Sequence, residues 1–297
     1  TRGCIGCHEQ RQGIAVSPNT GKAPIAAGNA PVRPKTPNWG TNGIIEYEAV
    51  VQPVFDKYCV SCHSGRDPDG RLDLSASHTT VYNMSYMELT DKALVHFTPG
   101  TGRTPAQPTN DYDEQSPLSR GTLLSRLTPY LEDPDHCGKA MSWDERYRIY
   151  CWIDSNVPFY SHYRQLSPTI LTQQAREALA DVYKRRCAGC HDQRPRKDAA
   201  SCLTQYHQAV HVPPEPGQWG IAQSGMRVRH LNLSHPEHSA ALVAPLSKAA
   251  GGWSLCSDPG VFKDRGDMDY QRMLKALSEG VVYRAQPGVA ELLREAK

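Results

Sequence analysis

The chain has 297 residues, with 33 Lys and Arg against 31 Asp and Glu, a formal net charge of +2 and 39% hydrophobic residues. This near-neutral balance lacks the clustered basic residues that a nucleic-acid surface requires. No stretch approaches the roughly 18 consecutive apolar residues that predict a membrane span, and the length itself predicts two domains. We therefore expect neither a nucleic-acid partner nor a membrane span.

The most specific feature of the sequence is the pattern Cys-x-x-Cys-His, which occurs three times. Two cysteines at this spacing lie on one helical turn and can bond one porphyrin, while the adjacent His can ligate its iron. Zinc and a redox dithiol are the alternatives, but zinc usually takes two separated ligand pairs, and a dithiol would not repeat with His each time. We therefore expect three covalently bound haem c groups. Their attachment residues are Cys4, Cys7 and His8, then Cys59, Cys62 and His63, then Cys187, Cys190 and His191.

Residues 1–43 contain the first motif. Five prolines stand between residues 9 and 43, with almost no periodic apolar pattern. A segment of this composition has little core of its own. We therefore expect an extended arm that carries the first haem, with His8 as the proximal ligand.

From residue 44 the pattern becomes that of a helix leading into Cys59. Its apolar face is formed by Val50, Val51, Val54 and Phe55, at positions i, i+1, i+4 and i+5. Pro53 is expected to kink or delay this helix. A second, closing helix with a broad apolar stripe is predicted over residues 143–156. Residues 44–165 thus form a predicted domain around the second haem.

The second half of the chain repeats this plan. The positions that precede Cys187 in the same register are Ala178, Leu179, Val182 and Tyr183. A closing helix is predicted over residues 269–279, ending at Gly280, so we interpret the two halves as a duplication. Residues 166–297 form the third part, with the third haem. The predicted fold class is mainly α: two helical domains resembling class I cytochrome c, with long loops, preceded by the extended arm.

The sixth ligand position of each iron decides between electron transfer and catalysis, because a side chain that fills it excludes small molecules. His136 is best placed for the second haem, since it precedes the closing helix, where class I cytochromes supply their distal ligand. Met141 is its rival. The first haem has no evident partner except His162, so its sixth position is either open or filled from a neighbouring domain. The candidates for the third haem, which we do not rank, are His230, His235 and His238.

Four cysteines lie outside the motifs, and they are Cys137, Cys151, Cys202 and Cys256. Covalent haem is attached outside the cytoplasm, so we expect a periplasmic or extracellular protein whose signal peptide has been removed. That compartment permits disulfides. One pair follows each of the last two motifs, which favours bonds 137–151 and 202–256. Four free thiols are the alternative.

Several stretches resemble the cytochrome portion of proteins related to the hydrazine synthase alpha subunit. They are Cys4-x-x-Cys-His-Glu, VQPVFDKYCVSCH over residues 51–63, WIDSNVPFY over 152–160 and, in a C-terminal haem domain, segments between 231 and 253. The resemblance covers most of the chain and implies a β-propeller domain or sister subunits as partners. That family's catalytic haem has a tyrosine a few residues beyond the haem-binding His. Neither His8 nor His63 is followed by one here, so hydrazine synthesis is not implied.

The function predicted from these features is a triheme c-type cytochrome that transfers single electrons between redox proteins outside the cytoplasm. The first alternative is a haem enzyme, hydrazine synthase alpha-like or acting on another small nitrogen or oxygen species, with one open iron. The second is a haem-bearing subunit of a larger complex, filament or homo-oligomer. High-spin iron would indicate the enzyme, and a monodisperse monomer would exclude the assembly.

Overall fold

The computed structural model describes residues 30, 37–39, 44–80, 82–96, 121–137, 140–160, 169–191, 230–257 and 260–283. The chain divides into two compact units, Thr1–Gly43 and Ile44–Lys297. The first unit ends where the sequence predicts the arm to end, but the arm's conformation and its haem motif lie outside the described residues. Both predicted cytochrome-like halves fall within the second unit. The described chain is mainly α-helical, as predicted, and contains no helix long and apolar enough to cross a membrane.

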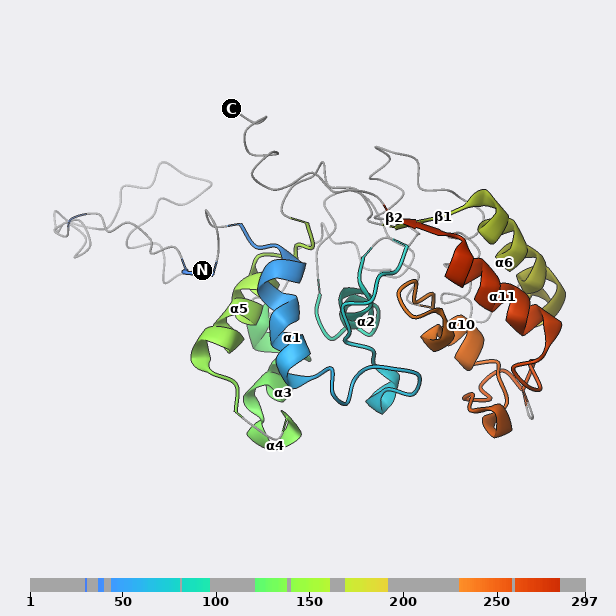
Figure 1. Cartoon of the computed structure of the whole chain (residues 1–297). Coiled ribbons are helices and arrows are strands. Elements are labelled where there is room, and N and C mark those ends of the chain that lie inside the picture. The colour runs from blue at the N-terminus through green and yellow to red at the C-terminus, as the bar shows by residue number, and fades with distance from the viewer. Residues whose placement is uncertain are drawn as a thin grey trace, which may run out of the picture. The chain divides into compact units, whose positions relative to one another are not determined.

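The helix that leads to Cys59 begins as the π-helix η4 (Tyr47–Val51) and continues as α1 (Gln52–Tyr58) (Figure 1). Pro53 stands in the first turn of α1, where its missing N–H and fixed φ disturb no hydrogen bond of that helix. This agrees with the expected delay of the helix at that proline. The four residues of the predicted apolar face, Val50, Val51, Val54 and Phe55, are all buried.

The rest of the first half is built from short helices. They are η5 (Asp69–Arg71), α2 (Met84–Asp91), η6 (Thr122–Leu124), α3 (Thr128–Glu132), α4 (Pro134–Cys137) and α5 (Trp143–Asp154). The closing helix α5 packs against η4, and Figure 1 shows it beside α1. An aromatic cluster fills this contact, with Tyr47 at ring-centroid distances of 5.0 Å from Trp152 and 5.5 Å from Phe159.

The apolar stripe of α5 is narrower than predicted. Ile149, Trp152 and Ile153 are buried, whereas Trp143 and Tyr147 are 65% and 40% exposed. A broad apolar stripe is buried only if other elements pack against both of its sides. Helix α5 packs on the side that faces η4. The aromatic residues at the start of α5 therefore lie on the surface.

In the described part of the second half, one strand precedes the helices along the chain and one strand follows them. Strand β1 (Thr169–Leu171) pairs antiparallel with β2 (Val281–Tyr283), with Leu171 opposite Val281. Between them lie α6 (Gln173–Arg186), α7 (Ala188–His191), η7 (Pro236–His238), α10 (Ala240–Val243), η8 (Lys248–Ala250) and α11 (Met268–Glu279). Figure 1 shows α6 and α11 side by side.

The pair α6 and α11 forms the core of the second half. Leu179, Val182 and Tyr183 of α6 are buried there with Met273 and Leu277 of α11, as the sequence pattern predicts. Ala178 is only half-buried, and Ala175 is buried in its place. A Cβ added to Gly280, at the end of α11, would lie 2.2 Å from the Cβ of Ala175. The close approach of the two helices therefore requires glycine at this position.

Replacing Gly280 with Ala should force the two helices apart. The added Cβ would clash with the packed methyl group of Ala175 and with the carbonyl oxygen of Ala276, which would lie 2.3 Å away. Neither of these atoms is the end of a flexible side chain that could move aside. We expect a loss of about 1–3 kcal/mol in the free energy of unfolding. Urea denaturation followed by circular dichroism measures this, with the exposed neighbour Glu279→Ala as control. Equal stability of the two variants would show that the helices do not meet so closely.

The carboxylate of Glu145 links the two helices of the first half. It accepts hydrogen bonds from Lys57 and Tyr58 at the end of α1 and forms a capping box with Ser142 at the start of α5. Desolvation raises the pKa of Glu145, but the hydrogen bonds from Lys57, Ser142 and Tyr58 outweigh it and lower the pKa to about 2. The carboxylate therefore stabilises the fold above pH 4.5, the ordinary value, and this contribution is lost as the pH falls towards 2.

Replacing Glu145 with Gln should lower the free energy of unfolding at pH 7 by about 1 kcal/mol, because these partly solvated bonds are screened by water. The variant should also lose less stability than the wild type between pH 5 and pH 2. Denaturation curves across this range provide the measurement. Asp144→Asn serves as the matched control, since Asp144 pairs with Arg148 one turn along the same helix. If the stability of Glu145→Gln changed with pH as that of the wild type does, Glu145 would not be the source of this pH dependence.

Candidate functional site

The first cysteine has nearly the same backbone conformation in the two Cys-x-x-Cys-His motifs that the structure describes. Cys59 caps α1 with φ −115° and ψ −37°, and Cys187 caps α6 with φ −119° and ψ −38°. Each of these residues donates its N–H to the carbonyl four residues earlier, at 2.8 Å, and accepts at 3.1 Å from the N–H of the second cysteine of its motif. The duplication inferred from the sequence thus extends to the hydrogen bonds of the motif.

The cysteine sulfurs are placed alike in the two halves. The first cysteine of each motif is half-buried and the second is exposed. Burial, with a smaller effect of Cys137, raises the pKa of Cys59 to about 12, and burial raises that of Cys187 to about 11. A redox dithiol needs a readily formed thiolate, which these surroundings disfavour. They suit a neutral sulfur, as in a thioether.

The imidazole of His63 is held in one tautomer. Its Nδ1 lies 2.9 Å from the carbonyl oxygen of Asp69 in η5. A backbone carbonyl can only accept a hydrogen bond, so Nδ1 carries the proton and Nε2 keeps its lone pair. Histidines that ligate metals are commonly oriented by such a bond. His63 is therefore prepared to act as a metal ligand through Nε2.

A cavity of about 500 Å³ lies beside this motif. Cys59, Cys62 and His63 line it together with both predicted rivals for the distal position, His136 and Met141. Its apolar wall is formed by Leu72, Leu74, Leu94, Leu127 and Leu131. Its size and its mostly apolar lining are those of a cofactor pocket.

The rings of His63 and His136 lie 6.1 Å apart between centroids and within 25° of parallel. A metal bound by two imidazoles holds their centroids about 6 Å apart, because each bond is about 2 Å long and each ring adds about 1 Å. The separation of His63 and His136 is therefore of the size that one metal ion between the two rings would require. Met141, 5% exposed, lines the same cavity without an equally specific relation to His63.

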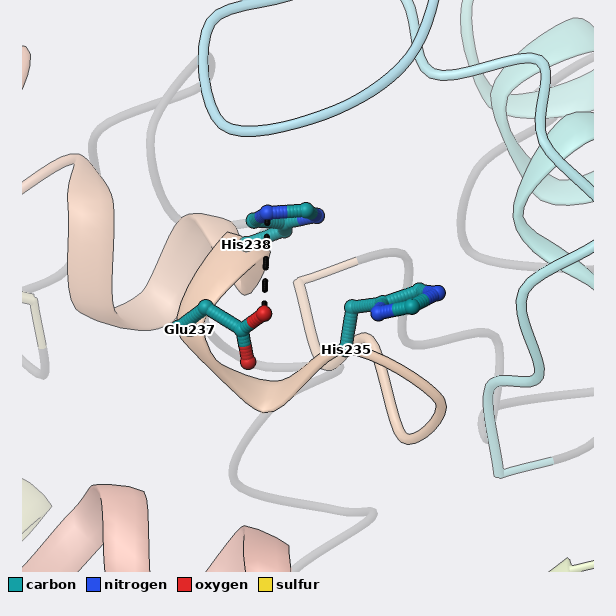
Figure 2. Close-up of side chains that lie close together, drawn as sticks. All are labelled: His235, Glu237 and His238. Carbon is teal, nitrogen blue, oxygen red and sulfur yellow. Dashed lines mark ion pairs between the residues drawn. The ribbon is translucent and has the colours of Figure 1, made fainter.

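The candidates for the other two haems are described only in part. His191 ends α7, but its side chain lies outside the described residues, as do Cys4, Cys7, His8 and His162. His230 is half-buried and its carbonyl accepts a hydrogen bond from Ala241. The structure brings His235 and His238 together on η7, beside Glu237 (Figure 2). Sequence reasoning did not include Glu237 in this group.

The unassigned cysteines have neighbours that the sequence did not predict. Cys137 lies close enough to Cys59 to contribute to the raised pKa of Cys59, and Cys256 lies close enough to Cys187 and Cys190 to affect their electrostatics. Cys137 and Cys151 are both free thiols, so the preferred 137–151 bond is not formed in this structure. Cys202 lies outside the described residues, and the 202–256 bond stays a prediction.

In the first half, a cysteine pair at a helix end lies beside an oriented imidazole and an apolar cavity that also contains a second imidazole. In the second half, a cysteine pair also stands at a helix end. No protein-family model matches this chain, and no curated protein or solved structure matches it either. The chemistry of the site is therefore the basis on which function can be inferred.

Proposed function

We propose that the chain is a triheme c-type cytochrome that transfers single electrons between redox protein partners outside the cytoplasm. The observation that carries this proposal is the pair His63 and His136, whose rings lie 6.1 Å apart in the cavity beside Cys59. Two imidazoles at this distance would fill both axial positions of one iron. A filled sixth position favours electron transfer over catalysis on a small molecule.

The residues of the first half would each contribute to holding such a group. Cys59 and Cys62 would supply the thioether sulfurs, and the Asp69 carbonyl keeps His63 in the tautomer that binds through Nε2. When bound, the haem would supply an iron that takes up and releases one electron. The leucine wall of the cavity keeps water away, which is one of the factors that set the potential of a haem.

The cavity also has a positive edge. Lys92 and Arg126 both line it, and among the described residues Arg126 has no carboxylate partner. Lys92 is paired with Glu88 at 3.2 Å and bonds to the carbonyls of Gly70 and Arg71. Cations here would balance the two carboxylates that every haem carries. The apolar wall and the positive edge together suit an amphipathic macrocycle.

The same assignment extends to the other motifs by their sequence. Cys187, Cys190 and His191 would hold the third haem, and the matching backbone of Cys59 and Cys187 supports this extension. Cys4, Cys7 and His8 would hold the first. His230 and His238 stay proposed as candidate distal ligands for the third haem. The location outside the cytoplasm follows from where covalent haem is attached.

The attachment sites can be tested by removing one cysteine pair at a time. Cys59→Ala with Cys62→Ala should reduce the covalent haem content from three to two per chain, and Cys187→Ala with Cys190→Ala should do the same. Intact mass and the pyridine haemochrome absorbance per protein measure the content. Cys137→Ala is the matched control: this thiol lines the same cavity as Cys59 but belongs to no motif, so the variant should keep all three haems. A wild-type chain without covalent haem would refute the proposal.

The distal ligand of the second haem can be tested by two substitutions. His136→Ala should convert one of three haems from low-spin to high-spin and let it bind carbon monoxide after reduction. Electron paramagnetic resonance and difference absorbance report these changes. Met141→Leu keeps about the volume of the side chain in the same cavity. This variant should leave all three haems low-spin. The reverse result would make Met141 the ligand.

A further inference from the structure

We propose that His235, Glu237 and His238 form a binding site for a divalent late first-row transition metal ion such as Zn²⁺, separate from the haem centres. The group is drawn in Figure 2, where all three side chains come from the turn around η7. This inference does not depend on the presence of haem in the chain. It assigns His238 to the metal site, which leaves His230 as the C-terminal candidate for the third haem.

The three residues offer ligand atoms that converge. One atom from each side chain lies within 4.8 Å of the others, and His238 Nε2 is 3.7 Å from Glu237 Oε1. The two imidazole rings are 5.3 Å apart between centroids and within 26° of parallel. Atoms bound tetrahedrally to zinc at about 2.0–2.2 Å lie about 3.3 Å apart. Small rotations of the three side chains would shorten the distances between their ligand atoms, which are up to 4.8 Å, to this value.

The convergence follows from the local backbone. His235 is the N-cap of η7, with φ −132° and ψ 76°, and His238 is the last residue of that turn. The N–H of His238 donates to the carbonyl of His235 at 2.9 Å and closes the turn. Pro236 fixes the φ of the first position after His235. The 3₁₀ turn thus brings two imidazoles to one side.

The loop that carries these residues is fixed by hydrogen bonds. The buried Asn232 side chain accepts from the N–H groups of Ser234 and His235 at 3.2 and 2.7 Å. The buried Ser239 hydroxyl accepts from the Asn232 N–H at 3.0 Å and so joins the two ends of the turn. The Leu233 N–H donates to the His78 carbonyl at 2.8 Å. A ligand set on a fixed loop loses little conformational entropy on binding.

The donor atoms select the class of metal. Two imidazoles with one carboxylate is a ligand set that zinc and its late first-row neighbours accept, whereas calcium and magnesium prefer oxygen alone. The carboxylate balances part of the charge of the ion. His235 and Glu237 are exposed and His238 is half-buried, so a fourth position would be open to water. The described structure holds no thiol in this group.

Isothermal titration of the intact chain with zinc chloride tests the site. We expect one equivalent of zinc to bind with a micromolar dissociation constant, and at least a tenfold weaker affinity after His235→Ala or Glu237→Gln. Glu177→Gln is the matched control, because Glu177 is an exposed acid on α6 that accepts a hydrogen bond from Gln173. Thermal unfolding and haem content of each variant show that it is folded; Glu237→Gln changes only an exposed side chain.

The competing assignment of His238 to a haem is tested on the same proteins. The low-spin resonance signals of His235→Ala and His238→Ala should equal those of the wild type. Conversion of a haem to high-spin in His238→Ala would make it a haem ligand and overturn the metal site. Absence of zinc binding to the wild type, or equal binding by all variants, would overturn it as well. A chain without haem would refute the cytochrome proposal and leave the zinc titration valid.

Discussion

The packing of each motif-bearing helix against a closing helix is the constraint on which the rest of the structure depends. Helix α1 has seven residues, too few to be stable alone in water, so its conformation relies on burial. Phe55 and Val54 supply that burial, at about 2 kcal/mol each. This packing fixes the end of the helix at Cys59. The direction of Cys59, the position of His63 and the cavity between α1 and its neighbours all follow from it.

The carboxylate of Glu145 adds a polar component to this packing. It bonds to Tyr58, the residue directly before the first cysteine of the motif, while capping α5. In the second half the corresponding role is steric, since Gly280 lets α11 approach α6 closely. Ion pairs from Arg185 and Arg186 to Asp269 then connect the end of α6 to the start of α11. Two halves with the same plan thus secure the motif by different contacts.

Apolar periodicity was enough to predict the helices that carry the motifs, because burial of one face is a local property of the sequence. Val50, Val51, Val54 and Phe55 are buried as the spacing predicts, and α11 ends at Gly280. The position of His136 in the cavity with His63 also agrees with its place before the closing helix. The π-turn at Tyr47 and the strand pair β1–β2 could not be predicted, because both depend on contacts distant in sequence.

Other features of the site were hidden for the same reason. Cys137 lies close enough to Cys59, 78 positions away in the chain, to affect its pKa, and it forms no bond with the nearer Cys151. Glu237 joins His235 and His238 through the backbone of the turn at η7, and a sequence pattern alone does not predict that conformation. The polar residues that fix this loop, Asn232 and Ser239, carry no motif.

The central claim is that this chain carries haem irons whose axial positions are filled by side chains. Its most direct test is the electron paramagnetic resonance spectrum of the oxidised chain, with absorbance of the reduced chain recorded with and without carbon monoxide. Electron transfer predicts three low-spin signals and no shift with carbon monoxide. A spectrum without haem signals, or a high-spin signal with a carbon monoxide complex, would contradict it.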